Sequence, residues 1–131
     1  MKGYIANIAE TTLENNNFRK VLYTGKNSQL VVMSINPGEE IGAEVHKLDQ
    51  FIRIEAGEGK VILDGVEHIV KDDYAIVIPA GANHNVINTS PEVMKLYTVY
   101  SPPEHKDGII HATKGDAMND HDDHFDGKTT E

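Results

Sequence analysis

The sequence predicts an all-β domain, a sandwich or barrel of short strands, and three observations support this. Apolar side chains in the middle of the chain alternate with a period of two, and turn signals rich in Gly, Pro and Asn recur every six to ten residues. No amphipathic helix is indicated between residues 18 and 103, and only a weak helical pattern covers residues 7–16. A chain of 131 residues has room for one such domain with a single core.

The expected strands follow one another between turns. They cover residues 29–35, 50–56, 60–63, 66–70, 74–78, 84–88 and 93–100. The first strand ends at Asn36-Pro37-Gly38, and Pro102-Pro103 closes the series. Asp64-Gly65 predicts a two-residue hairpin, because both central positions of such a turn need a positive φ. Short strands at this spacing are typical of sandwiches and barrels.

The composition excludes several classes of function. The formal net charge is −9, which argues against binding to nucleic acid and to anionic membranes. The chain has no cysteine, so disulfides, thiolate metal sites and a thiol nucleophile are excluded. No apolar run approaches the ~20 residues that cross a bilayer. The first residues lack a signal-peptide pattern, so the expected compartment is the cytoplasm.

The acidic residues gather toward the C-terminal end of the chain. From Glu104 onward there are eight acidic residues and three lysines, so this segment carries −5 of the net charge of −9. Beyond residue 112 large apolar side chains almost vanish, and little burial is left to offset the entropy of ordering. We therefore expect a barrel over residues 1–112 and a mobile acidic tail over residues 113–131.

Two motifs suggest a metal site. In the first, Gly38 is followed after five residues by Glu44, then by His46, after three more by Gln50 and after six more by Gly57. Glu44 and His46 are two positions apart, so on a strand their side chains share a face.

The second motif lies 15 residues further along the chain. Asp73 is followed after five residues by Pro79, then by Gly81, after two more by His84 and after three more by Asn88. Together the motifs resemble the two signatures of the cupin superfamily, G-x5-H-x-H-x3-E-x6-G and G-x5-P-x-G-x2-H-x3-N. The resemblance covers residues 38–88, and the strand pattern extends it to about residues 18–103.

The resemblance implies a double-stranded β-helix, the cupin jelly-roll barrel, that holds one divalent metal ion. Carried over position by position, its metal ligands are Glu44, His46, Gln50 and His84. Glu44 replaces a histidine and Gln50 replaces a glutamate, so the ligand set keeps one negative charge. Two oxygens and two nitrogens favour manganese or iron, while zinc or nickel is possible. An empty site is the alternative, because cupins without a metal exist.

The function that these residues indicate is chemistry on a small, oxygen-rich organic molecule. The ion would act as a Lewis acid, and the fold supports isomerases, lyases and dioxygenases. Glu44 is a possible general base. A non-catalytic module that binds or senses a small ligand or the metal is the alternative, and a purely structural dimeric barrel is a third. Exposed strand edges predict a homodimer in which residues before Phe18 contribute.

The remaining polar residues have weaker indications. Arg53 is out of phase with the ligands and is expected in a salt bridge or at an interface, and His68 is expected to be a satisfied polar residue. The segment with His105, Asp107 and His111 has the alternative of folding over the barrel mouth. His121-Asp122-Asp123-His124 is expected to be solvated. Apolar side chains in phase with the ligands are expected to line the barrel: Ile52, Ile54 and Val86.

Overall fold

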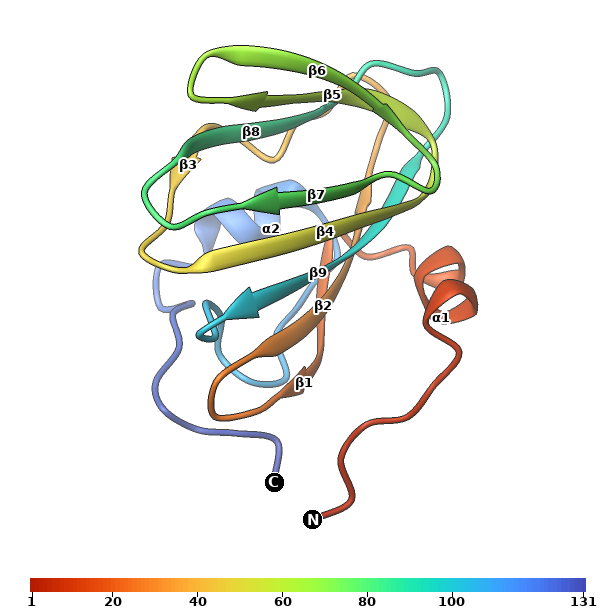
Figure 1. Cartoon of the computed structure of the whole chain (residues 1–131). Helices are drawn as coiled ribbons and strands as arrows, with labels where there is room; N and C mark the ends of the chain where they lie inside the picture. Colours follow the sequence, from red (N-terminus) through yellow and green to blue (C-terminus); the bar gives the residue numbers. More distant parts are fainter.

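Two antiparallel sheets face each other in the computed structural model, which describes residues 1–131 (Figure 1). The strand order is β10-β1-β2-β9-β4-β7 in the larger sheet and β3-β8-β5-β6 in the smaller one. The strands are β1 (Arg19–Thr24), β2 (Gln29–Ile35), β3 (Glu44–Val45), β4 (Asp49–Ala56), β5 (Glu58–Leu63), β6 (Val66–Lys71), β7 (Ala75–Ile78), β8 (Asn83–Asn88), β9 (Met94–Ser101) and β10 (Ile110–His111). This is the double-stranded β-helix that the motifs predict.

All the expected strands are present, with ends that differ from the predicted ones by at most two residues. Asp64 and Gly65 adopt φ values of 46° and 83°, which confirms the predicted hairpin between β5 and β6. The short strand β3, the first strand β1 and the last strand β10 were not specified by the sequence pattern. Ile52, Ile54 and Val86 are buried between the sheets, as expected for residues that line the barrel.

Two short helices flank the barrel. Helix α1 (Ile8–Glu14) confirms the weak pattern over residues 7–16, and Asn7 caps it by accepting a hydrogen bond from the Glu10 N–H at 3.1 Å. Helix α2 (Lys114–Asn119) starts at a capping box between Thr113 and Asp116. Neither helix is long and apolar enough to cross a membrane.

Residues 113–131 run back along the barrel. The Phe125 N–H donates to the Glu104 carbonyl at 2.9 Å, and the Thr130 N–H donates to the Thr24 carbonyl at 2.9 Å. The Glu131 carboxylate accepts hydrogen bonds from the Lys2 and Gly3 N–H groups, so the two ends of the chain lie close together (Figure 1). These contacts weigh against the mobility expected for this segment. Its mobility and the division of the chain at residue 112 stay predictions.

Candidate metal centre

Strands β3 and β8 bring two of the predicted ligands, Glu44 and His84, together. Glu44 and His84 are direct partners in the antiparallel pair, so their side chains project from the same face of the smaller sheet. His46 lies one residue beyond β3 and points the same way, as the spacing of two predicts. One donor atom from each of Glu44, His46 and His84 lies within 4.8 Å of the others, so these three residues are able to hold one metal ion.

Gln50 approaches from the opposite sheet. It is 4% exposed, and its amide NH2 donates to Thr98 Oγ1 at 3.0 Å. The amide oxygen, Oε1, is buried and has no hydrogen-bond partner. Leaving a buried acceptor unsatisfied costs about 1–3 kcal/mol, unless a ligand supplies the missing contact. An amide oxygen facing a divalent ion is such a contact, so the orphaned atom fits the predicted role of Gln50.

The ring of His84 is held in the tautomer that a metal ligand requires. Its Nδ1 lies 3.1 Å from the Ala82 carbonyl oxygen, which accepts a hydrogen bond and cannot donate one. The hydrogen is therefore on Nδ1, and the lone pair is on Nε2. Metal-binding histidines are oriented in this way by their second ring nitrogen.

Glu44 and His46 share a hydrogen bond within the site. His46 Nε2 donates to Glu44 Oε2 at 2.5 Å. Burial would raise the pKa of Glu44, but this hydrogen bond and the charge of His46 lower it below its ordinary value. Burial would lower the pKa of His46, but the same bond and the Glu44 charge raise it. A proton therefore lies between His46 Nε2 and Glu44 Oε2, two atoms that could coordinate a metal ion.

Four donors of this kind suit a divalent ion. Two imidazoles, one carboxylate and one amide oxygen form the mixed nitrogen and oxygen set that hard transition-metal ions accept. The carboxylate would balance part of the charge of such an ion.

Part of the C-terminal segment lies beside the centre. Tyr100 is buried, and its ring centroid lies 6.0 Å from that of His46 and 5.1 Å from that of His105. His105 Nδ1 lies 2.7 Å from Asp123 Oδ2, and His105 Nε2 is buried without a partner. His105 therefore packs between Tyr100 and Asp123, and the alternative that this segment folds over the barrel mouth stays a prediction.

The other polar residues of this segment bond to one another. His111 Nε2 lies 2.9 Å from Asp120 Oδ2, while Asp107 accepts a hydrogen bond from Thr130 Oγ1 at 2.7 Å. His121 and His124 make no side-chain hydrogen bond and lie outside the donor cluster, as expected for solvated residues. Asp123, from the same expected solvated stretch, is instead buried against His105, with 6% of its side chain exposed.

Arg19 is a site residue that sequence reasoning missed. It lies on β1 in phase with Val21, so both side chains point inward, and Arg19 is only 9% exposed. It lines a cavity of about 180 Å³ beneath α2, together with one of the predicted ligands. The lining residues are Phe18, Arg19, Ile41, Glu44, Lys114, Ala117 and Met118. The sequence signal that could have identified it is the spacing of two between Arg19 and Val21, which predicts that both side chains lie on the inward face of a strand.

Comparison with known proteins agrees with this geometry. The cupin domain family matches residues 31–100, which is more than half of the chain. The chain belongs to the cupin family. It is 48% identical over 124 residues to uncharacterized protein YrkC of Bacillus subtilis (strain 168), covering 89% of this chain and 67% of YrkC.

Two further relatives extend the comparison. Uncharacterized protein L612 of Acanthamoeba polyphaga mimivirus is 43% identical to this cupin over 113 residues, which cover 82% of the cupin and 70% of L612. The crystal structure of BH2720 from Bacillus halodurans superimposes with a TM-score of 0.88 at 45% identity, and the match covers 89% of the cupin and 94% of BH2720. The fold and the family are thus shown, while none of these names gives an activity.

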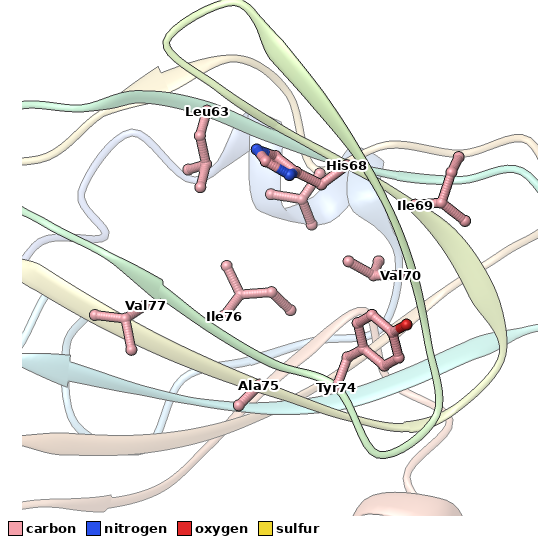
Figure 2. A pocket seen from close by; sticks show the side chains of 9 residues that line it. Leu63, His68, Ile69, Val70, Tyr74, Ala75, Ile76 and Val77 are labelled. Atoms are coloured by element: carbon pink, nitrogen blue, oxygen red, sulfur yellow. The ribbon is translucent and has the colours of Figure 1, made fainter.

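A second hollow of the cupin lies away from the donors. Figure 2 shows it between residues of β5 and β6 on one side and the start of β7 on the other. Its volume is about 290 Å³, and eight of its nine lining residues are hydrophobic. His68 lines it; its exposed side chain makes no hydrogen bond within the chain and is open to water, so the expectation of a satisfied polar residue stays a prediction. Arg53 forms the expected salt bridge on the outer face, 3.0 Å from Asp73.

Proposed function

We propose that this cupin is a metalloenzyme that acts on a small, oxygen-rich organic molecule by an isomerase, lyase or dioxygenase type of reaction. One manganese or iron ion would be held by Glu44, His46, Gln50 and His84. The observation that carries the proposal is the convergence of one carboxylate and two imidazole donors within 4.8 Å, and the buried, unsatisfied amide oxygen of Gln50 on the other sheet supports it. Zinc or nickel would also fit these ligands.

The bound ion would supply Lewis acidity toward carbonyl, carboxylate or hydroxyl oxygens. The protein contributes orientation and a dry wall, since Ile52, Ile54 and Val86 close the barrel on the inner side. Glu44 is the proposed general base, but its lowered pKa makes it a weak one near neutral pH. His105 is a second titratable group on this side of the barrel, and burial lowers its pKa, which keeps the ring neutral but makes it a weaker base than a free histidine.

A non-catalytic ligand- or metal-binding cupin is the second candidate. It is favoured by the hydrogen bond between Glu44 and His46, because a carboxylate committed to the ligand set is poorly placed to move protons. Oxygen consumption and isomerisation assays with sugar acids and short keto acids separate the two functions. Turnover with any of them supports the enzyme, whereas binding without turnover supports the second candidate.

Metal analysis tests the shared part of both candidates. Protein purified without a histidine tag is expected to contain about one equivalent of manganese, iron or zinc, and Glu44→Ala and His84→Ala are expected to lose it. The control is His68→Ala, which removes a histidine far from the donors. Wild-type protein that stays folded and binds none of these metals would contradict the proposal.

We also propose that the cupin works as a homodimer in the cytoplasm. The free edges of β6 and β7 and the exposed side chains of Ile69 and Val77 support association, because such edges are usually covered. The residues before α1 are exposed and available to a partner copy. Light scattering at micromolar concentration should give twice the chain mass of 14.5 kDa, and a fluorescent fusion tests the compartment.

A further inference from the structure

Arg19 is a buried cation without a counter-ion. Although only 9% of the residue is exposed, no carboxylate oxygen lies within 4.0 Å of its guanidinium nitrogens. Its Nε–H is buried and has no hydrogen-bond partner. The only other arginine, Arg53, lies on the outer face and pairs with Asp73. The buried arginine is thus the unpaired one.

The contacts that Arg19 makes orient it without neutralising it. Its guanidinium carbon lies 5.3 Å from the centre of the Phe18 ring, and Nη1 donates a long hydrogen bond of 3.5 Å to His111 Nδ1. His111 in turn donates to Asp120. A guanidinium offers five N–H groups in a planar fork, and here four of them make no hydrogen bond. Burying such a group unpaired is costly, so an incoming anion would relieve the cost.

Arg19 shares a cavity with one residue of the metal centre, Glu44. Lys114 of α2 adds a second positive charge to the wall of this cavity. The charge of Arg19 reaches this carboxylate, since it contributes to the lowered pKa of Glu44 after the larger effects of burial and His46. A volume of about 180 Å³ corresponds to roughly six water molecules at ~30 Å³ each, which suits a small molecule.

We propose that Arg19 anchors the carboxylate of a small organic anion whose other oxygens reach the ion held by Glu44, His46 and His84. This inference rests on the proposed function and names its ligand class, short carboxylic acids with a second oxygen-bearing group. The guanidinium fork matches the two oxygens of a carboxylate, so the anion binds in one orientation. Apolar Phe18 and Ile41 complete the wall and disfavour long polar substrates.

Calorimetric titration of the Mn(II)-loaded protein with malonate tests this role. Arg19→Gln is expected to weaken malonate binding by about 10- to 100-fold, the range for lost hydrogen bonds to a charged group. Arg19→Lys is expected to lie between, because a lysine keeps the charge but lacks the fork. Malonamide, which is similar in shape but uncharged, is expected to bind the wild type weakly and to be insensitive to Arg19→Gln.

Two controls keep the outcomes separate. Arg53→Gln removes the outer arginine and is expected to leave malonate binding unchanged. Mn(II) affinity, measured on each variant before malonate is added, is expected to stay at the wild-type value in Arg19→Gln and Arg19→Lys, and thermal melts establish that each variant is folded.

Each alternative result overturns a defined part. Unchanged malonate binding in folded Arg19→Gln overturns the anchor and leaves the metal centre standing. Stronger binding of inorganic phosphate than of malonate, lost in the same variant, overturns the carboxylate class. Folded wild-type protein that binds none of manganese, iron and zinc overturns the anchor together with the proposed function.

Discussion

Two of the hollows of the barrel differ in chemistry more than in size. The hollow between β6 and β7 is the larger, about 290 Å³ against 180 Å³, and nearly all its lining is apolar. The smaller one contains a buried guanidinium and a predicted metal ligand beneath α2. Unsatisfied polar atoms occur at the smaller hollow, on Arg19, and at the metal centre, on His46 and Gln50. Apolar surface indicates contact with protein, whereas buried unpaired polar atoms indicate a ligand.

The largest expected effect is a loss of metal affinity, which we expect on substitution of His84 at the metal centre but not of His68 in the apolar hollow. His84→Ala is expected to weaken Mn(II) binding by more than the ~100-fold upper range for outer partners of a ligand, because it removes a ligand itself. His68→Ala, in the apolar hollow, is expected to leave the affinity unchanged. Competition with a fluorescent chelator measures both. Equal losses in the two variants would remove the distinction between the hollows.

The apolar hollow is tested by adding a charge to it. Val77→Lys places an ammonium on an exposed edge strand and is expected to weaken self-association at least tenfold, since an unpaired charge in an interface is costly. Sedimentation velocity over a range of concentrations measures the effect. Val66→Lys, exposed on β6 but outside the hollow, is the matched control. A Val77→Lys protein that associates like the wild type would show that the hollow is not an interface.

Substitution of Gln50 is expected to have a smaller effect, which weakens metal binding but does not weaken the stability of the metal-free protein. Gln50→Leu is expected to weaken Mn(II) binding about tenfold, which corresponds to about 1.4 kcal/mol. The metal-free variant should be at least as stable as the wild type, because it no longer buries an unsatisfied amide oxygen. Chelator competition and urea unfolding measure the two quantities. A destabilised variant with unchanged metal affinity would assign Gln50 a purely structural role.

The smallest expected effect concerns the segment that covers the polar hollow. Burial lowers the pKa of His105, so protonation favours the undocked segment as the pH falls below 6.5. Burial alone would raise the pKa of Asp123, but the hydrogen bonds from His105 and from the Lys106 N–H lower it below 3.8. The contribution of Asp123 is therefore present above pH 3.8 and is lost as the pH falls through its folded value.

Both groups thus loosen the segment in acid, His105 as the pH falls below 6.5 and Asp123 only below pH 3.8, so the change between pH 6.5 and pH 4 belongs to His105. Hydrogen exchange at the Phe125 N–H, which bonds to Glu104, is expected to lose protection between pH 6.5 and pH 4 after correction for the intrinsic rate. The amide of Val86 in the core is the internal control. A constant ratio of the two protection factors over this range would contradict the expectation.

The barrel could be predicted because its signals are local. Alternation fixes which side chains face inward, and the turns at Asn36-Pro37-Gly38 and Asp64-Gly65 need backbone conformations that only a few residues adopt readily. The donor set followed from the resemblance to the cupin motifs, while spacing alone predicted that Glu44 and His46 share a face; in the structure His84 lies on the neighbouring strand.

Other parts depend on contacts between distant residues. Arg19 approaches Glu44 only after the barrel has closed, and its lack of a counter-ion has no signature in sequence. The path of residues 113–131 is set by hydrogen bonds such as the one between Asp123 and His105. The low apolar content of this segment predicts little hydrophobic burial, but it gives no information about such hydrogen bonds. The capping box at Thr113 and Asp116 was a readable signal for α2, although the surrounding residues are polar.

The hydrogen bond between His46 and Glu44 has a consequence for calorimetry. A cation that takes both Nε2 and Oε2 must displace the proton between them into the solvent. The heat of metal loading then includes the heat with which the buffer takes up that proton. Titrations in buffers of different ionisation enthalpy should therefore differ by an amount proportional to that enthalpy, and the slope counts the protons released per ion.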